Sequence, residues 1–216
     1  MNAQPYPPQC LVALMDKEGR NLDLVVEAAT GNGVLRQTLL EGLISTDETY
    51  RYNCHKSLMQ LTESHPHLIY PAWDTLTGQL DSRNAYHRIS AACLLANLAA
   101  ADTENRFEVL FERYFELLDD DKVIVACYVA RSAWKIAQAK PALRPTVLRH
   151  LLAIENTRHT QGRKDLIKAD IIGSLDHIYP DAENKEEILQ FIETQLTCTS
   201  PKTRKAAKRF LKKYQK

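Results

Sequence analysis

Side chains that could bind a metal are present in this 216-residue sequence, but their spacing does not suit that role. His65 and His67 flank Pro66 in an expected turn, and no carboxylate or thiol stands at ligand spacing beside them. The run Asp119–Asp121 lacks the glycine and the distant glutamate of a calcium-binding loop, so an acidic helix cap explains it more simply. We therefore predict no metal site and no cofactor.

The five cysteines could in principle supply a nucleophile or a disulfide framework. Their number is odd and no Cys-x-x-Cys pair occurs, which argues against structural disulfides and against a zinc site. Cys54, Cys93 and Cys127 fall inside helical patterns, where a cysteine usually acts as a small buried apolar side chain. A single cysteine nucleophile is the alternative interpretation.

No catalytic signature is visible elsewhere in the chain. The metalloprotease HExxH, the hydrolase GxSxG, the Walker phosphate loop and the dinucleotide-binding glycine motif are all missing from the sequence. Gly31-Asn32-Gly33 lacks the Lys-Ser/Thr ending of a phosphate loop, and the end of a helix accounts for it better. The sequence gives no reason to assign an enzymatic activity, although it does not decide the question.

Composition and charge indicate an ordinary globular protein. Hydrophobic residues make up 44% and charged residues 25%, and 28 basic against 27 acidic side chains leave a net charge of +1. No apolar run is long enough to cross a membrane, and the first residues have no signal-peptide pattern. We expect a cytoplasmic protein with no membrane partner.

Apolar positions repeat along the chain with a period near forty residues. Pairs of apolar anchors, three residues apart, recur with successive first anchors separated by 37, 38, 42 and 36 residues. Side chains three apart lie on one face of a helix, so each pair predicts a helix that buries that face. The anchor pairs are Leu58 and Leu61, Leu95 and Leu98, Ala133 and Ile136, Leu175 and Ile178, and Leu211 and Tyr214.

A second set of helices is expected between these anchor helices, because each intervening segment has its own apolar stripe. The turns between the helices are short and polar, and no alternating strand pattern occurs. These patterns predict an all-α fold, a stacked array of about five helical hairpins. We expect a single domain over residues 1–216, with a short N-terminal helix in 1–33, five repeats in 34–216 and a basic terminal helix at 201–215. The intervening segments are Val34–Ile44, His67–Leu80, Glu104–Leu118, Ala142–Ile154 and Glu183–Leu196.

Basic residues stand seven positions before four of the five first anchors. They are Arg51, Arg88, Lys168 and Arg204, and acidic turns at Asp47, Asp81 and Asp119–Asp121 precede three of the anchor helices. With the stretch Ser200-Pro201-Lys202-Thr203-Arg204, this pattern resembles the HEAT-repeat family over about residues 34 to 216. The resemblance implies a right-handed α-α superhelix with a structural ladder of aspartate and arginine between neighbouring repeats. It also implies a scaffold that binds partners.

The last helix is strongly basic on one side. Residues 201–216 contain eight basic and no acidic side chains, while the apolar residues of the helix fall on its opposite side. Three interpretations stay open: a polar cap that ends the array, a surface that binds nucleic-acid phosphates, or a dock for an acidic protein or a second copy. The basic stripe is formed by Lys205, Lys208, Arg209, Lys212 and Lys213.

The anchor helices of such an array are expected to line its concave face. There we predict a partner-binding set formed by Tyr128, Arg131, Lys135, Lys164 and Lys168, while Trp134, adjacent to an anchor, is expected in the core. The predicted function is a non-catalytic scaffold that binds another protein or peptide, with no small-molecule ligand. The alternative is nucleic-acid binding through the basic helix and the groove, related to the HEAT-like DNA glycosylases.

Overall fold

The computed structural model describes residues 21–215, and within them the chain forms eleven α-helices and no strand. The predicted all-α fold is confirmed. The prediction of one domain over residues 1–216 includes positions outside the described residues, so it stays a prediction. Cys10 also lies outside the described residues. The helices are α2 (Leu22–Gly31), α3 (Gly33–Gly42), α4 (Glu48–Ser64), α5 (Trp73–Gln79), α6 (Ala85–Leu98), α7 (Arg106–Glu116), α8 (Val123–Ala139), α9 (Arg144–Leu152), α10 (Gln161–Ile178), α11 (Lys185–Thr194) and α12 (Pro201–Tyr214).

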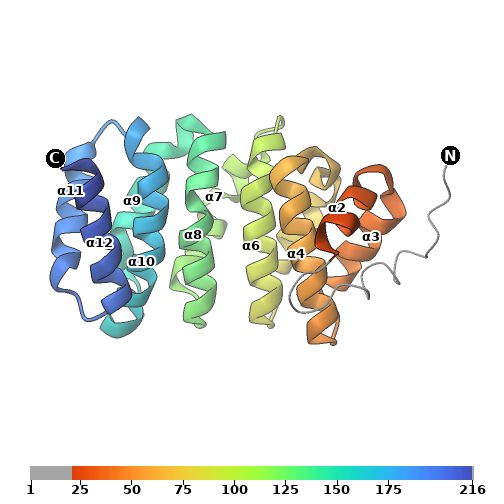
Figure 1. Ribbon diagram of the computed structural model, residues 1–216, viewed down its shortest axis with the longest axis horizontal. Coiled ribbons are helices and arrows are strands. Elements are labelled where there is room, and N and C mark those ends of the chain that lie inside the picture. Colours follow the sequence, from red (N-terminus) through yellow and green to blue (C-terminus); the bar gives the residue numbers. More distant parts are fainter. Residues whose placement is uncertain (1–20, 216) are drawn as a thin grey trace.

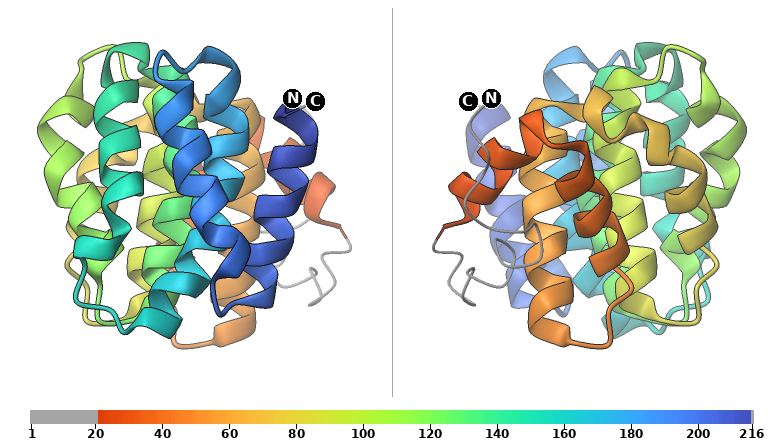
Figure 2. Two further views of the ribbon diagram at one scale, coloured as in Figure 1. Left: turned by 90° about the vertical axis from the view of Figure 1, so that its left-hand side faces the viewer. Right: turned by 90° about the vertical axis from the view of Figure 1, so that its right-hand side faces the viewer.

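The helices stack along one axis as pairs in chain order, from α2 and α3 at one end to α11 and α12 at the other (Figure 1). The even-numbered helices pack against one another in sequence: α2 on α4, α4 on α6, α6 on α8, α8 on α10 and α10 on α12. The odd-numbered helices form a second layer behind them, which Figure 2 shows from the two ends of the stack. We call the solvent-facing side of the even-numbered helices the inner face. Within residues 21–215, no helix is both long and apolar enough to cross a membrane.

Polar side chains at the turns set the beginnings of several helices. Asn32 ends α2 and also caps α3, accepting a hydrogen bond from the Leu35 amide at 3.0 Å. Asp47 accepts from the Tyr50 amide at 2.9 Å, and Ser200 caps α12 in the same way. Because such side chains satisfy amides that have no partner inside the helix, each turn stops one helix and starts the next.

The expected helix His67–Leu80 is interrupted in the structure. Two 3₁₀ turns, Pro66–Leu68 and Tyr70–Ala72, precede the short α5. Pro71 explains the interruption, because proline has no amide hydrogen and disfavours α-helical geometry in the residue before it. The turns still place Trp73 in the core, 3% exposed, with its ring edge-on to Phe107 at 6.0 Å.

The anchors form a continuous apolar core along the stack. The first anchors Leu58, Leu95, Ala133 and Leu175 are fully buried, whereas Leu211 is only partly buried. The difference has a simple cause: each earlier anchor helix is covered on both sides by its neighbours, and α12 is the last described helix. A helical hairpin therefore completes its core only when the next hairpin stacks on it.

The expected ladder of basic and acidic residues is present at one step of the stack. Arg88 Nε donates to Asp120 at 2.7 Å and one of its terminal nitrogens reaches Asp121 at 3.0 Å, joining α6 to the following turn. Arg51 and Arg204 instead donate to carbonyl oxygens of their own preceding turns, Ser45 and Cys198, each at 2.7 Å. These two arginines thus fix the turn before the helix rather than a neighbouring repeat.

Two glycines inside helices test how tightly the stack is packed. A Cβ added at Gly42 would lie 2.2 Å from Cys54 Sγ, whereas nothing lies within 4 Å of one added at Gly173. We expect Gly42→Ala to lower the free energy of unfolding by about 1–3 kcal/mol through overpacking. Gly173→Ala should raise it by about 0.5–1 kcal/mol, because alanine favours the helix. Urea denaturation of both variants measures the difference, and equal effects would contradict the packing of α3 on α4.

Candidate functional site

Large apolar side chains are exposed on the inner face in four successive helices. Tyr52 on α4 is 50% exposed, Tyr86 on α6 60%, and Ile124 on α8 and Leu166 on α10 47% each. All four stand in the first half of their helices, and we call them the exposed apolar row. Tyr86, Ile124 and Leu166 stand nine residues before the first anchors of their repeats, and Tyr52 stands six before Leu58. Water-exposed apolar side chains that gather in one place are typical of a binding surface, whereas isolated ones are not.

Three of these helices, α4, α6 and α8, enclose a hollow of about 520 Å³ on the inner face. We call it the tyrosine hollow, because three tyrosines form much of its wall. Its lining also includes one carboxylate, one guanidinium and one imidazole. The lining residues are Glu48, Thr49, Arg51, Tyr52, His55, Tyr86, Ile89, Ser90, Ile124 and Tyr128.

Each tyrosine of the hollow carries a cation over its ring. The Arg51 guanidinium lies 5.1 Å from the centre of the Tyr86 ring, the Lys56 ammonium 5.5 Å from that of Tyr52, and the Arg131 guanidinium 4.7 Å from that of Tyr128. Such contacts hold a flexible side chain against an aromatic surface and keep its charge at the rim. The hollow therefore combines apolar walls with positive charge around them.

Arg131 also joins two helices through an acidic side chain. Its Nε and one terminal nitrogen donate to Asp170 Oδ1 on α10 at 3.1 and 3.0 Å, and Lys202 on α12 approaches the same carboxylate at 3.3 Å. The Asp170 side chain is nearly buried. One carboxylate thus links α8, α10 and α12 across the inner face, a bridge that the ladder pattern in the sequence did not predict.

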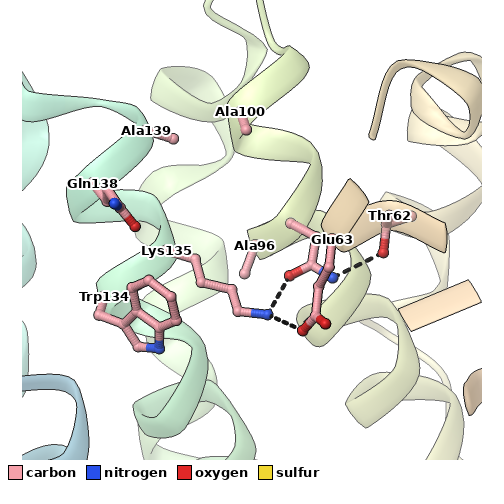
Figure 3. Close-up of a pocket in the computed structure, with 9 residues that line it drawn as sticks. Thr62, Glu63, Ala96, Ala100, Trp134, Lys135, Gln138 and Ala139 are labelled. Carbon is pink, nitrogen blue, oxygen red and sulfur yellow. Dashed lines mark hydrogen bonds and ion pairs between the residues drawn. The ribbon is translucent and has the colours of Figure 1, made fainter. Parts of the chain in front are cut away.

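A second hollow of about 460 Å³ lies further along the same helices (Figure 3). Lys135 Nζ donates to Asn97 Oδ1 at 2.6 Å and to Glu63 Oε1 at 2.7 Å, which ties α8 to α6 and α4. Trp134 forms one wall and stacks on His177 of α10, with ring centres 4.1 Å apart. Three alanines, Ala96, Ala100 and Ala139, complete the lining together with Thr62 and Gln138. Trp134, expected in the core, is half-buried and borders this second hollow.

The lysine of the second hollow and two cysteines of the even-numbered helices are paired or buried. The Lys135 ammonium forms an ion pair with the Glu63 carboxylate, so it is not a free amine nucleophile. Burial raises the pKa of Cys54 to about 12 and that of Cys93 to about 11, which keeps both thiols protonated at neutral pH. Within residues 21–215, no cluster of three or more histidine, cysteine, aspartate or glutamate side chains could hold a metal ion.

Two lysines of the predicted binding set face away from solvent. Lys168 is 3% exposed, and its ammonium binds Asp165 at 3.0 Å and Glu155 at 2.5 Å. Lys164 donates to the backbone oxygen of Glu155 at 2.6 Å. Both hold the turn before α10, so neither is placed to meet a partner, while Tyr128, Arg131 and Lys135 lie on the inner face as expected.

The Asp165 carboxylate, one of the two that bind Lys168, belongs to a closed polar network. Although burial alone raises the pKa of Asp165, hydrogen bonds from Thr199, Lys168 and Gln161 hold it well below its usual range. Thr199 donates to it through both its amide and its hydroxyl group. This network joins α10 to the turn before α12 and leaves no free charge for a ligand.

The basic stripe lies on the exposed side of α12. Lys205, Lys208, Arg209 and Lys212 are exposed, and none of them forms an ion pair within the part of the chain that the structure describes. Lys213 differs, since it binds Asp176 of α10 at 2.9 Å. The three interpretations of the stripe remain open.

The apolar row can be found in the sequence once the anchors are known, because three of its four members stand at a fixed distance before them. Tyr86, Ile124 and Leu166 each stand nine residues before the first anchor of their repeat. Nine residues at 100° per residue amount to half a turn beyond two full turns, so this position faces opposite to the anchor. Large apolar residues recurring there predict an exposed apolar row rather than core. The corresponding residues of the first and last repeats are Thr49 and Lys202.

Comparisons with known proteins bear on the fold. No family model matches the chain, and no curated protein matches it. An engineered protein in a Northeast Structural Genomics Consortium crystal structure has a TM-score of 0.54 at 19% identity, over 96% of this chain and 98% of that chain. A second engineered protein from the same consortium has a TM-score of 0.50 at 20% identity, over 94% of this chain and 56% of that chain.

A designed armadillo repeat protein is more distant, with a TM-score of 0.44 at 15% identity over 95% of this chain and 97% of that chain. At such identities the likeness concerns the fold alone. The fold defines the chain as an all-helical repeat solenoid, and the assignment to the HEAT-repeat family remains a resemblance.

The imidazole in the lining of the tyrosine hollow gives the protein a pH dependence. Burial lowers the pKa of His55 from 6.5 to about 4, and its Nδ1 has no hydrogen-bond partner among the described residues. Between pH 6.5 and pH 4, His55 is therefore protonated in the unfolded chain and neutral in the folded chain. The free energy of unfolding falls as the pH drops from 6.5 towards 4. We expect a loss of up to about 3 kcal/mol from this group.

Chemical denaturation of the wild type and of His55→Phe between these two pH values measures the effect. The variant keeps an aromatic ring of similar size but cannot be protonated, so its stability should depend less on pH in this interval. Equally steep curves for the two proteins would contradict the prediction.

Proposed function

We propose that this protein is a non-catalytic scaffold that binds another protein or a peptide on its inner face, over the tyrosine hollow. A stack of helices gives this face a fixed shape, because each helix is held by its neighbours. A preformed surface loses little conformational entropy on binding, which suits it to hold an extended partner.

The observation that carries the proposal is the exposed apolar row. Tyr86, Ile124 and Leu166 are 60%, 47% and 47% exposed, and they occupy equivalent places on successive even-numbered helices. Tyr52 on α4 extends the row, three residues after the equivalent position of its own helix. Tyrosine is enriched in protein interfaces, since it combines a large apolar ring with a polar tip. The odd-numbered helices show a different pattern: Val109 on α7, 91% exposed, lines neither hollow.

A selection from a random peptide library tests the proposal. Peptides selected on the wild-type protein should lose at least tenfold in affinity for Tyr86→Ser, a change at a side chain that contributes little to the core. Val109→Ser is the matched control on the other layer and should bind like the wild type. Peptides that bind all three proteins equally would overturn the proposal.

Tyr86→Ser is a sharper probe than a charge reversal at Arg131. Arg131→Glu would place a second carboxylate beside Asp170 and disturb the bridge between α8 and α10. Any loss of binding by that variant would combine a local structural change with the loss of a contact.

The nucleic-acid alternative is tested with the same preparations. Duplex and single-stranded oligonucleotides are titrated at rising salt against the wild type and a Lys205→Glu, Lys208→Glu, Lys212→Glu triple variant. Phosphate contacts release counterions, so binding through the basic stripe should weaken steeply with salt and be lost in the variant. If the protein-binding proposal is right, one of two results is expected. Either no salt-dependent oligonucleotide binding is observed, or the triple variant loses that binding while its affinity for the selected peptides stays unchanged.

A further inference from the structure

The apolar row repeats once per helix, and this spacing selects the conformation of a bound chain. Neighbouring packed helices lie about 8–10 Å apart, so the equivalent side chains Tyr86, Ile124 and Leu166 on α6, α8 and α10 recur at about that distance. A ligand that uses the same contact on each helix must offer similar side chains at the same interval.

A polyproline-II segment meets this requirement and a β-strand does not. Polyproline II has three residues per turn and rises about 3.1 Å per residue, so every third side chain points the same way at intervals of about 9.3 Å. In a β-strand, side chains on one face are only about 6.6 Å apart, and they would lose register with the helices within two steps. Aromatic side chains lining a groove are also the usual receptor for polyproline II.

Charge around the row favours an acidic ligand. Arg51, Lys56 and Arg131 lie over the tyrosine rings, and Lys202 continues the register on α12. Glu48 is the carboxylate in the lining of the hollow, while Asp170 and Arg131 already bind each other. Arg51 and Lys56, which form no ion pair among the described residues, are therefore the cations left for a ligand. The Lys56 ammonium has no acceptor among the described residues, so it is available to a carboxylate of the ligand.

We propose that the inner face binds an acidic polyproline-II segment, with apolar side chains at every third position on the row and carboxylates between them at the cations. This inference rests on the proposed protein-binding function and names the class of partner. The apolar side chains of the segment contact Tyr86, Ile124 and Leu166, and its carboxylates pair with the Arg51 and Lys56 side chains at the rim.

Fluorescence anisotropy with three labelled peptides tests the inference. Each has about nine residues, about 28 Å in polyproline-II form, which places three leucines at the spacing of α6, α8 and α10. The first consists of Leu-Glu-Pro repeats, the second of Leu-Lys-Pro repeats, and the third contains the residues of the first in an order that destroys the period of three. The first peptide should bind at least tenfold more tightly than either of the others.

Two variants assign that binding to the inner face. Tyr86→Ser should weaken the first peptide at least tenfold by removing an apolar contact. Lys56→Glu should weaken the first peptide and strengthen the second, because it reverses one charge at the rim. Val109→Ser, on the other layer, should leave all three affinities unchanged.

The outcomes separate this inference from the function on which it rests. Equal affinity for the first and third peptides, while library peptides still depend on Tyr86, would overturn the polyproline-II assignment and leave the scaffold function standing. Tighter binding of the basic peptide would overturn the charge assignment. If no peptide, from the library or from the designed set, loses affinity for Tyr86→Ser, both proposals are overturned.

Discussion

The structure depends on one constraint: a single helical hairpin cannot bury the apolar side of its own anchor helix. Leu58, Leu95, Ala133 and Leu175 are buried because another helix covers each of them, while Leu211 at the last step stays partly exposed. Stacking is therefore the main source of stability, and burial of each large side chain contributes about 1.5–3 kcal/mol. The same constraint determines the inner face, since the helix side opposite the anchors is left to solvent in every repeat.

Much of the fold could be predicted from the sequence, because the repeat is encoded locally. Anchors three residues apart and short polar turns both predict stacked hairpins. Details that depend on one backbone atom were less predictable, as the interruption of the helix expected at His67–Leu80 shows. The long connection before α10 could not be interpreted from sequence either. In the structure, Arg158 binds Asp119 at 2.7 Å and His159 is buried against the Leu118 carbonyl oxygen, so this connection packs on the preceding repeat.

The candidate site was predictable only in part, since residue type alone does not tell which way a cation points. Lys168 and Arg131 both look like groove residues in the sequence, yet one is enclosed by Asp165 and Glu155 and the other lies over Tyr128. Their partners come from other turns and helices, which a single helix pattern does not reveal. The apolar row was different: its register relative to the anchors was present in the sequence, but it becomes meaningful only once the anchors are known to face the core.

The register nine residues before each anchor has a consequence for how such a surface can change over time. Thr49, Tyr86, Ile124, Leu166 and Lys202 occupy equivalent places, and each belongs to a different structural unit with its own buried contacts. Under the proposed function, a replacement at one of them would alter what the surface recognises at a single step and leave the anchors untouched. Duplication or exchange of whole hairpins would lengthen or reorder the recognised pattern in the same way. Recognition in this architecture can therefore diversify one unit at a time, with little loss of folding stability at each change.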